Sequence, residues 1–446
     1  MTSIVIPSTL IPPLDGLFDD SPCESAGVLF CREARGPTQT KLLANEFLPY
    51  ADGDYLERGV DKLVIDPVAV NNCIQRAKRL DLSIVQVHTH PLSNNANFSP
   101  TDLNGESEML PVLHRRVPNR HHGSLVLGRQ SSAARIYDSG LNVSSARIVA
   151  IGKNVQHLDA RAAPDEERFS RSYLALGKEG QVALQSTRVC IVGLGGIGAH
   201  VAQQLSYLGV EHVVLIDPDV IEASNLNRIV GAVPSDIGRS KVDVASDRYR
   251  AVLSAAALQP IAASVLDEKT ARSVIDCDVA LCCTDNHGSR AVLNWLAYQY
   301  LVPVIDMGIE IRVDENDAVG AIAGRVQLVG PGMPCLYCCE TLDVNRVRED
   351  FMTEEERAGD EYVVGGIVPQ PAVVTFNGIV ASLATSMLIG LTTDVPIQAR
   401  MQIVDLLKGQ VRLAEASARE DCPVCSRASA ILGQGDAMDA IWRKAG

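Results

Sequence analysis

Residues 187–198 read TRVCIVGLGGIG, a β-branched apolar run that changes into a glycine-rich turn. The next segment, AHVAQQLSYLG at 199–209, has the composition of a helix, and HVVLIDPD at 212–219 predicts a second strand. Strand, turn, helix and strand together form a βαβ unit. Nearly continuous apolar runs at 278–286 and 302–309 predict further buried strands of a parallel sheet.

The length of the chain predicts more than one domain, because 446 residues exceed the usual size of one core. A polar, alanine-rich stretch at 155–166 favours a boundary there, which gives domains at 1–157 and 165–446. The net charge is −14, and residues 1–160 contain 15 basic against 17 acidic side chains, so the excess of acid lies in the second part. Such a surface repels phosphate backbones, and we expect no nucleic-acid partner.

The start of the chain, MTSIVIPSTLIPPLDG, lacks the basic region of a secretory signal and is interrupted by prolines. The longest apolar run, GIVASLATSMLIGL at 378–391, is shorter than the roughly 20 residues of a membrane span and predicts a buried helix. We therefore expect a cytoplasmic protein with no membrane segment.

Four of the 12 cysteines form two CxxC pairs, Cys335 with Cys338 and Cys422 with Cys425. Two such pairs supply the four thiolates of a closed tetrahedral zinc site. The long interval between the pairs predicts a structural zinc that ties the tail to the body of the domain. Unrelated buried thiols are the alternative.

The glycine-rich turn has the form of a phosphate site, since backbone N–H groups at the start of a helix attract anions. Its glycines are Gly193, Gly195, Gly196 and Gly198. Asp217 follows at the distance at which an acidic residue holds a ribose, so a nicotinamide dinucleotide remains an alternative. Arg228 and Lys241 favour ATP instead, because a triphosphate needs cations as it reacts. Asp285, just after another predicted strand, is a candidate Mg²⁺ ligand.

From about residue 166 to 430, the chain resembles the adenylyltransferases that activate ubiquitin and the ubiquitin-like sulfur carriers of molybdopterin and thiamine synthesis. The motifs RFSR, GLGGIG, SNLNR, GRSK, CTDN and the two CxxC pairs occur in the family's order. The resemblance implies a Rossmann-like adenylation domain and a homodimer in which Arg171 reaches the neighbouring ATP site. It also implies roles for Asp217 and Asp219 at the ribose, for Asn225, Arg228 and Lys241 at the phosphates, and for Asp285 at magnesium.

In that family a C-terminal carboxylate attacks the α-phosphate of ATP, and pyrophosphate leaves. Members that then form a thioester carry a cysteine in the stretch that here reads DEYVVGGIVPQP at 360–371, where this chain has Tyr362 and Val363. Cys339 is the remaining nearby cysteine, and we expect it to be structural or accessory. The adenylate would then pass to a thiol of a partner such as a conjugating enzyme. The charged stretch at 343–361 is interpreted as a loop, either solvated or substrate-handling.

Residues 88–102 read HTHPLSNNANFSPTD and suggest a second chemistry. His88 and His90 project to the same face of a strand, and with Asp102 they offer three zinc ligands and an open position for water. Glu24 is the candidate general base, with Glu46 as a weaker rival, and Ser99 is a candidate donor to an oxyanion. Taken alone, a His-x-His pair equally fits ordinary core or surface histidines.

The combination of ESAGVL, HTHP and SPTD within residues 20–140 resembles the JAMM/MPN-plus metalloprotease domain. The resemblance implies an α/β zinc peptidase that acts on ubiquitin-like tails or isopeptide bonds. The leading hypothesis is therefore a bifunctional enzyme that uses ATP, Mg²⁺ and two zinc ions, one catalytic and one structural. It would trim a ubiquitin-like β-grasp protein and adenylate its C-terminal glycine. An adenylating enzyme for a sulfur carrier or small peptide is the alternative, and a nicotinamide-dependent oxidoreductase is a third hypothesis.

Overall fold

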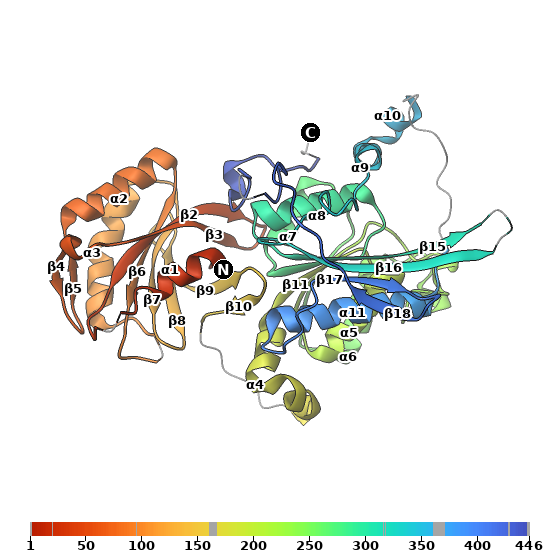
Figure 1. Ribbon diagram of the computed structural model, residues 1–446, viewed down its shortest axis with the longest axis horizontal. Helices are drawn as coiled ribbons and strands as arrows, with labels where there is room; N and C mark the ends of the chain where they lie inside the picture. The colour runs from red at the N-terminus through yellow and green to blue at the C-terminus, as the bar shows by residue number, and fades with distance from the viewer. Residues whose placement is uncertain are drawn as a thin grey trace. The chain divides into compact units, whose positions relative to one another are not determined.

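The computed structural model describes residues 2–19, 21–94, 96–159, 167–314, 316, 318–359, 371–426 and 429–443 (Figure 1). The chain divides into two compact units: unit 1 contains 1–162, 299–301 and 431–439, and unit 2 contains 163–298, 302–430 and 440–446.

Two short segments that the sequence placed in the second domain, 299–301 and 431–439, thus group with unit 1. The side-chain amide of Gln299 donates to the carbonyl of Gly435 at 2.8 Å. The Arg35 N–H donates to Asp436 Oδ2, also at 2.8 Å. These contacts join parts of the chain that are far apart in sequence.

Unit 1 is built on a ring of seven strands. In spatial order these are β1 (Thr2–Pro7), β3 (Thr40–Pro49), β2 (Ala26–Arg35), β6 (Ser83–Thr89), β7 (His122–Leu127), β8 (Ser132–Tyr137) and β9 (Val143–Ile151). The ring closes because β1 pairs with both β3 and β9, and β10 (Val155–His157) extends from β9. Alternate residues point inward and form an apolar core with Leu14 of the short helix α1 (Ile11–Asp15).

Two helices cover the outer face of this ring, α2 (Pro67–Leu80) and α3 (Pro100–Arg116) (Figure 1). Outward residues of β2 and β6, including Phe30 and Ile84, form a second core with Leu110 and Leu113 of α3. Asp66 caps the start of α2 by accepting the Val68 N–H. A small hairpin, β4 (Tyr55–Arg58) and β5 (Leu63–Ile65), precedes α2.

Unit 2 contains an eight-stranded sheet. Its spatial order is β13 (Ala257–Ile261), β12 (His212–Ile216), β11 (Arg188–Val192), β14 (Val279–Cys282), β15 (Val304–Val313), β16 (Val319–Val329), β17 (Met401–Asp405) and β18 (Gln410–Leu413). The strands from β13 to β15 are parallel, as expected, but β16, β17 and β18 add to the sheet antiparallel. The sheet is therefore mixed, because β15 and β16 form a hairpin that needs no crossover helix.

The helices of unit 2 are α4 (Ser170–Ser186), α5 (Gly196–Leu208), α6 (Lys241–Val252), α7 (Glu268–Ile275), α8 (His287–Gln299), α9 (Val344–Phe351), α10 (Glu354–Gly359) and α11 (Val374–Thr392). Gly177 interrupts α4 with a φ of 72°. The described part of the charged stretch at 343–361, expected to be a loop, instead contains α9 and α10, with Asp343 capping α9.

Helix α11 is longer than the apolar run that predicted it. With 19 residues it is long and apolar enough to cross a membrane by length and composition alone, although half of that window is buried within the protein. It packs against α5, β15 and β16.

Candidate functional site

The polar cluster of unit 1 brings together three predicted metal ligands. His88 lies at the end of β6, His90 follows that strand, and Asp102 lies in the first turn of α3. Their nearest nitrogen and oxygen atoms all lie within 4.8 Å of one another. Side chains on alternate residues of one strand thus meet a carboxylate from the start of a helix.

The geometry of this cluster fits a metal ion. His88 Nε2 is 3.1 Å from Asp102 Oδ1, and His90 Nε2 is 3.3 Å from Asp102 Oδ2. Although His88 Nε2 is buried, it makes no hydrogen bond of acceptable geometry to any described residue. Imidazole nitrogens and carboxylate oxygens are ligands that zinc accepts. A buried imidazole nitrogen without a hydrogen bond is available for such a bond.

Glu24 lies beside the cluster, with Oε1 3.5 Å from His90 Nε2. Burial raises the pKa of this carboxyl group, although His88 and His90 oppose the shift. A carboxyl group with a raised pKa next to a metal-ligand set is suited to hold and release a proton. The rival Glu46 instead forms an ion pair with Arg76 of α2 at 2.7 Å.

The backbone around Glu24 is held by the β4–β5 hairpin. Arg58 Nε donates to the Glu24 carbonyl at 2.9 Å, and the Glu24 N–H donates to the carbonyl of Gly59 at 2.8 Å. The Tyr55 hydroxyl accepts the Ala26 N–H at 3.0 Å. These residues could not be found from the sequence, because their partners are about 30 positions away and no motif includes them.

Ser99 is the N-cap of α3. Its Oγ accepts the Asp102 N–H at 3.2 Å, while its own N–H donates to Asp102 Oδ2 at 2.6 Å. This capping box fixes the Asp102 carboxylate at the cluster. The lone pair used for the cap leaves the hydroxyl proton of Ser99 able to donate, so its predicted role as an oxyanion donor stays a prediction.

The glycine-rich turn of unit 2 connects β11 to α5. Gly193 has a φ of 89°, and a Cβ at Gly198 would lie 1.9 Å from the Gly193 carbonyl oxygen, so the turn closes only with glycine at both positions. A Cβ at Gly196 would lie 2.1 Å from the side chain of Asn377. At Gly195, by contrast, a Cβ would meet nothing within 4 Å. The backbone at Gly195 is therefore open to a ligand.

Asp217 follows β12 and is 4% exposed. Its Oδ2 accepts the Leu194 N–H at 2.6 Å, which ties it to the glycine turn. Burial raises the pKa of this carboxyl group, opposed by the charge of Lys241. Lys241 Nζ lies 3.8 Å from Asp217 Oδ1 and donates to Asp219 Oδ2 at 2.7 Å. The lysine ammonium is thus held close to the turn by two carboxylates.

The remaining predicted residues of unit 2 surround this edge of the sheet. Asn225 is buried, and its Oδ1 accepts the Glu222 N–H at 3.3 Å. Arg228 NH1 donates to the Ser224 carbonyl at 2.6 Å, and its Cγ lies near Gly196. Asp285 is exposed in the loop between β14 and α8. The Cys283–Thr284 peptide before it lies directly against Gly193, so the carboxyl ends of β11, β12 and β14 meet there.

Arg171 lies exposed on the first turn of α4. The predicted reach of Arg171 into a neighbouring subunit concerns a second chain, so that role stays a prediction.

The two CxxC pairs converge. Cys335 Sγ is 3.6 Å from Cys422 Sγ, and Cys338 Sγ is 3.5 Å from Cys425 Sγ. All four sulfur atoms lie within 4.8 Å of one another. A tetrahedral zinc with Zn–S bonds of about 2.3 Å places its sulfur atoms roughly 3.8 Å apart, so the four thiols fit a closed zinc site.

Cys339 stands next to this cluster. Its Sγ accepts a hydrogen bond from Gln327 Nε2 at 3.0 Å, and burial raises the pKa of the thiol. A raised pKa disfavours the thiolate that a thioester requires. The other stretch considered for a thioester, with Tyr362 and Val363, lies outside the described residues.

Comparison with known proteins gives matches for the second part of the chain. Residues 169–424 match the model of the ThiF family. The molybdopterin-synthase adenylyltransferase of Escherichia coli K12 is 30% identical over 262 residues, which are 58% of this chain and 96% of that protein. The sulfur carrier protein ThiS adenylyltransferase of the same organism is 28% identical over 268 residues, 60% of this chain and 97% of that protein.

Two further similarities are more limited. The SAMP-activating enzyme E1 of Haloferax volcanii is 31% identical over 174 residues, 39% of this chain and 61% of that protein. A crystal structure of E. coli MccB superposes with a TM-score of 0.48 and 20% identity, covering 60% of this chain and 74% of that one. The family match begins at residue 169 and does not reach the histidine cluster of unit 1.

Proposed function

The chain belongs to the ThiF family, and on that premise we propose that it is an ATP-dependent adenylyltransferase that activates the C-terminal carboxylate of a small sulfur-carrier or ubiquitin-like protein. Relatives named for molybdopterin synthase and for ThiS support this choice of partner. The observation that carries the proposal is the open backbone at Gly195, together with Asp217, which accepts the neighbouring Leu194 N–H and lies 3.8 Å from the Lys241 ammonium. A small peptide substrate is the second possibility for the same site.

The residues of the site have distinct tasks in this proposal. The N–H groups at the start of α5 bind phosphate oxygens, and Asp217 accepts from the ribose. Lys241 and Arg228 neutralise the charge that develops as the partner's carboxylate attacks the α-phosphate and pyrophosphate leaves. Asn225 donates to the same phosphates. Asp285, an exposed carboxylate at this edge, would hold Mg²⁺, which supplies further positive charge when bound.

Lys241 supplies positive charge to a phosphate when its ammonium leaves one of its carboxylate partners. In the described structure its ammonium pairs with Asp219, which is exposed, and lies farther from the buried Asp217. Because the Asp219 side chain is 63% exposed, water can replace the lysine as its partner when a phosphate binds to the Lys241 ammonium. Hydride transfer to a nicotinamide would require neither Lys241 nor Arg228, which separates the oxidoreductase hypothesis from this one.

The decisive measurement is ATP–pyrophosphate exchange with candidate β-grasp proteins that end in Gly-Gly, followed by intact-mass analysis. We expect exchange and a partner mass increased by an adenylate. An absence of exchange with every such partner and with small peptides, combined with reduction of NAD, would contradict the proposal. We expect the adenylate to pass to a thiol of a partner, because Cys339 is poorly ionised.

A dimer with shared sites is part of the proposal. Because Arg171 is exposed at the start of α4, it is available to a second copy of the chain. Mixing Arg171→Ala with Asp285→Ala protein should restore part of the exchange activity that each variant lacks, since one site of the mixed dimer is then complete. Absence of any recovery in mixtures that form dimers would contradict the role in trans.

We propose a second function for unit 1, a zinc-dependent peptidase that acts on the tail or isopeptide bond of the same partner. The convergence of His88, His90 and Asp102, with Glu24 beside them, favours it. These three side chains would hold zinc, which lowers the pKa of a bound water when present. Glu24 would hold the proton and release it to the leaving amine. The resemblance to the JAMM/MPN-plus domain supports the same assignment.

Glu24→Gln tests this second function, because it removes the proton carrier and leaves the three ligands in place. We expect loss of cleavage by about 10²–10⁴-fold, with the zinc content and the ATP–pyrophosphate exchange unchanged. Glu46→Gln is the matched control, since Glu46 contacts Arg76 and not the cluster. If ATP–pyrophosphate exchange is equally fast with the trimmed and the untrimmed partner, cleavage does not prepare the tail for adenylation. That result would favour deconjugation as the role of the peptidase.

A further inference from the structure

The ring of unit 1 has a layer of polar residues at one end of its apolar core. Every second residue of each strand points inward. At the end of the ring away from His88, each strand carries a polar residue at or next to its last inward position. These residues are Thr2, Glu33, Thr40, Ser83, His121, Asp138 and Ser144. Thr2 pairs with Thr40, and Ser144 pairs with the inward Ile136, so these residues lie at the same end of the ring.

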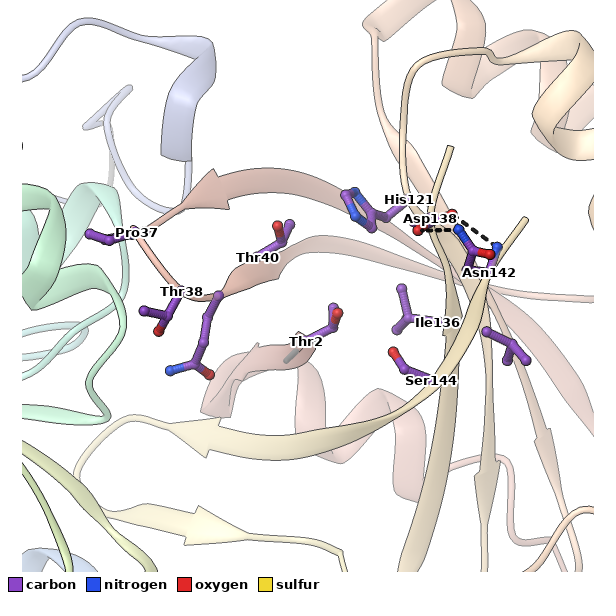
Figure 2. A pocket seen from close by; sticks show the side chains of 12 residues that line it. Thr2, Pro37, Thr38, Thr40, His121, Ile136, Asp138, Asn142 and Ser144 are labelled. Carbon is purple, nitrogen blue, oxygen red and sulfur yellow. Dashed lines mark hydrogen bonds between the residues drawn. The ribbon is translucent and has the colours of Figure 1, made fainter. Parts of the chain in front are cut away.

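A cavity of about 420 Å³ opens at this end of the ring. Figure 2 shows Thr38 and Thr40 on one side of it, Asp138 and Ser144 on the other, and Thr2 between them. Its size lies within the roughly 300–1,000 Å³ of small-molecule sites, which often occupy the mouths of β-barrels.

The His121 ring is oriented by a buried carboxylate. Glu33 Oε1 accepts the His121 N–H at 2.7 Å and lies 3.1 Å from His121 Nδ1. Burial opposes ionisation of Glu33, but the hydrogen bonds from His121 and Arg35 outweigh it and lower its pKa to about 2. An ionised Glu33 only accepts, so Nδ1 carries the proton. In the neutral ring, Nε2 is therefore a hydrogen-bond acceptor.

Asp138 supplies a second acceptor on the cavity wall. Its Oδ1 accepts from the backbone N–H groups of Gly140 and Asn142, at 2.8 and 2.9 Å. The Asn142 side chain donates to both oxygens and lowers the pKa of this carboxyl group. Since Asn142 Nδ2 is the one described partner of Oδ2, this oxygen retains acceptor capacity.

The lining selects the charge of a ligand. Among the described residues that line the cavity there is no lysine, arginine or large aromatic side chain. The lining therefore offers no permanent cation that neutralises a phosphate and no large ring that stacks on a nucleobase. Its polar groups are a carboxylate, an imidazole acceptor and hydroxyl groups, which together accept more hydrogen bonds than they must donate.

We propose that this cavity binds a primary alkylammonium group, with its N–H donors shared between Asp138 and the neutral His121 ring and its alkyl chain against the exposed Val143. An ammonium has three donors and no acceptor, which matches the acceptors on the wall. The threonine and serine hydroxyls satisfy the remaining donor. The site is separate from the metal-ligand cluster, since Glu33 lies seven residues along β2 from Ala26, which pairs with His88.

The test uses n-pentylamine, 1-pentanol and pentanoate, three probes of equal chain length, with the full-length protein and saturation-transfer NMR. We expect the amine to bind at least about tenfold more tightly than the alcohol, because a charge-assisted hydrogen bond is lost. We expect no saturable binding of the carboxylate. Equal binding of amine and alcohol, or tighter binding of pentanoate, would overturn the proposal.

Two variants locate the site. Asp138→Asn removes the negative charge and should weaken the binding of n-pentylamine by about tenfold. Glu108→Gln, which changes an exposed acid on α3, should leave this binding unchanged. Ser144→Phe places a ring at an exposed, inward position of β9 and should block the cavity even if Asp138→Asn fails to fold. Unchanged amine binding in a folded Ser144→Phe protein would refute the location.

Two kinds of ligand carry such an amine: a free small molecule and the lysine side chain of a peptide. Nα-acetyl-lysine N-methylamide is the probe that separates them. Tighter binding than n-pentylamine would assign the site to a peptide-borne lysine, and weaker binding would assign it to a free amine.

Discussion

Arg58 Nε donates a hydrogen bond of 2.9 Å to the backbone carbonyl of Glu24. The same guanidinium contacts Ser25 Oγ and donates to Asp19 Oδ2 at 2.8 Å. One planar side chain therefore holds both the carbonyl of Glu24 and the side chain of Ser25, while the Glu24 carboxylate itself lies 3.5 Å from His90 Nε2. Arg58 positions the proton carrier of the proposed peptidase without touching the metal ligands.

Arg58→Ala should lower the kcat of peptide cleavage by about 10–100-fold, the usual cost of removing a residue that orients a site. The zinc content should stay constant, because no ligand is changed. The measurement is cleavage kinetics beside metal analysis. Arg76→Ala, which removes the partner of Glu46, is the control and should leave cleavage intact. Equal losses in the two variants would indicate a general effect on stability.

Gly195→Ala should abolish ATP binding without unfolding the protein. The added Cβ meets nothing within 4 Å, yet it would occupy the backbone face offered to phosphate. Gly198→Ala should behave differently, since its Cβ would lie 1.9 Å from the Gly193 oxygen and the turn must move. Nucleotide titration and melting temperature distinguish the two. Normal ATP affinity in the Gly195 variant would place the phosphates elsewhere.

Lys241→Ala should reduce ATP–pyrophosphate exchange by about 100-fold or more, because it removes a cation from the developing charge. Lys408→Ala is a suitable control. That lysine pairs with Asp405, and its side chain is 70% exposed. Exchange that survives in Lys241→Ala at the wild-type rate would remove this residue from the proposed mechanism.

Cys422→Ser should lower the melting temperature of the zinc-loaded protein. The four thiols join the tail of unit 2 to the segment after β16, and a loss of about 3 kcal/mol corresponds to roughly 6–12 °C for a domain of this size. Cys339→Ser leaves the four ligands intact and should melt like the wild type. A stoichiometry of bound zinc that is the same in wild type and Cys422→Ser would contradict the assignment.

Stability should fall between pH 6.5 and 4 because of His122. Burial lowers the pKa of this imidazole to about 4, while Nδ1 accepts the Ile84 N–H and Nε2 donates to the Val117 carbonyl. The unfolded chain binds a proton near pH 6.5 and the folded chain does not, so stability is complete above that pH and declines by up to about 3 kcal/mol towards pH 4.

Hydrogen exchange of the β6 and β7 amides at several pH values measures this decline. His122→Gln should flatten the curve over this interval. Glu33 affects stability at lower pH. Its pKa is 4.5 in the unfolded chain and about 2 in the folded one, so its contribution to stability is lost only as the pH falls through that range. An equally steep decline in the His122 variant would assign the effect to another group.

Much of the second unit could be predicted from the sequence. The strand, glycine turn and helix at 188–208 form where the pattern placed them, because β-branched runs and glycine act through neighbouring residues. The antiparallel strands after β15 were not predicted, since a hairpin of this kind has no distinct signal in an apolar run. The charged stretch after Asp343 became helical because a cap at Asp343 outweighed its low apolar content.

The sequence by itself determined where the candidate sites lie: the candidate ligands at 88–102, the glycine turn and the two CxxC pairs are patterns of residue type at short spacing. Only the tertiary structure decided that Arg58 holds Glu24, that Glu33 orients His121 across 88 positions, and that seven strand ends form one polar layer. Spacing along a strand or helix is set by local backbone geometry. Contacts between distant residues depend on which strands pair, and no single segment encodes that choice.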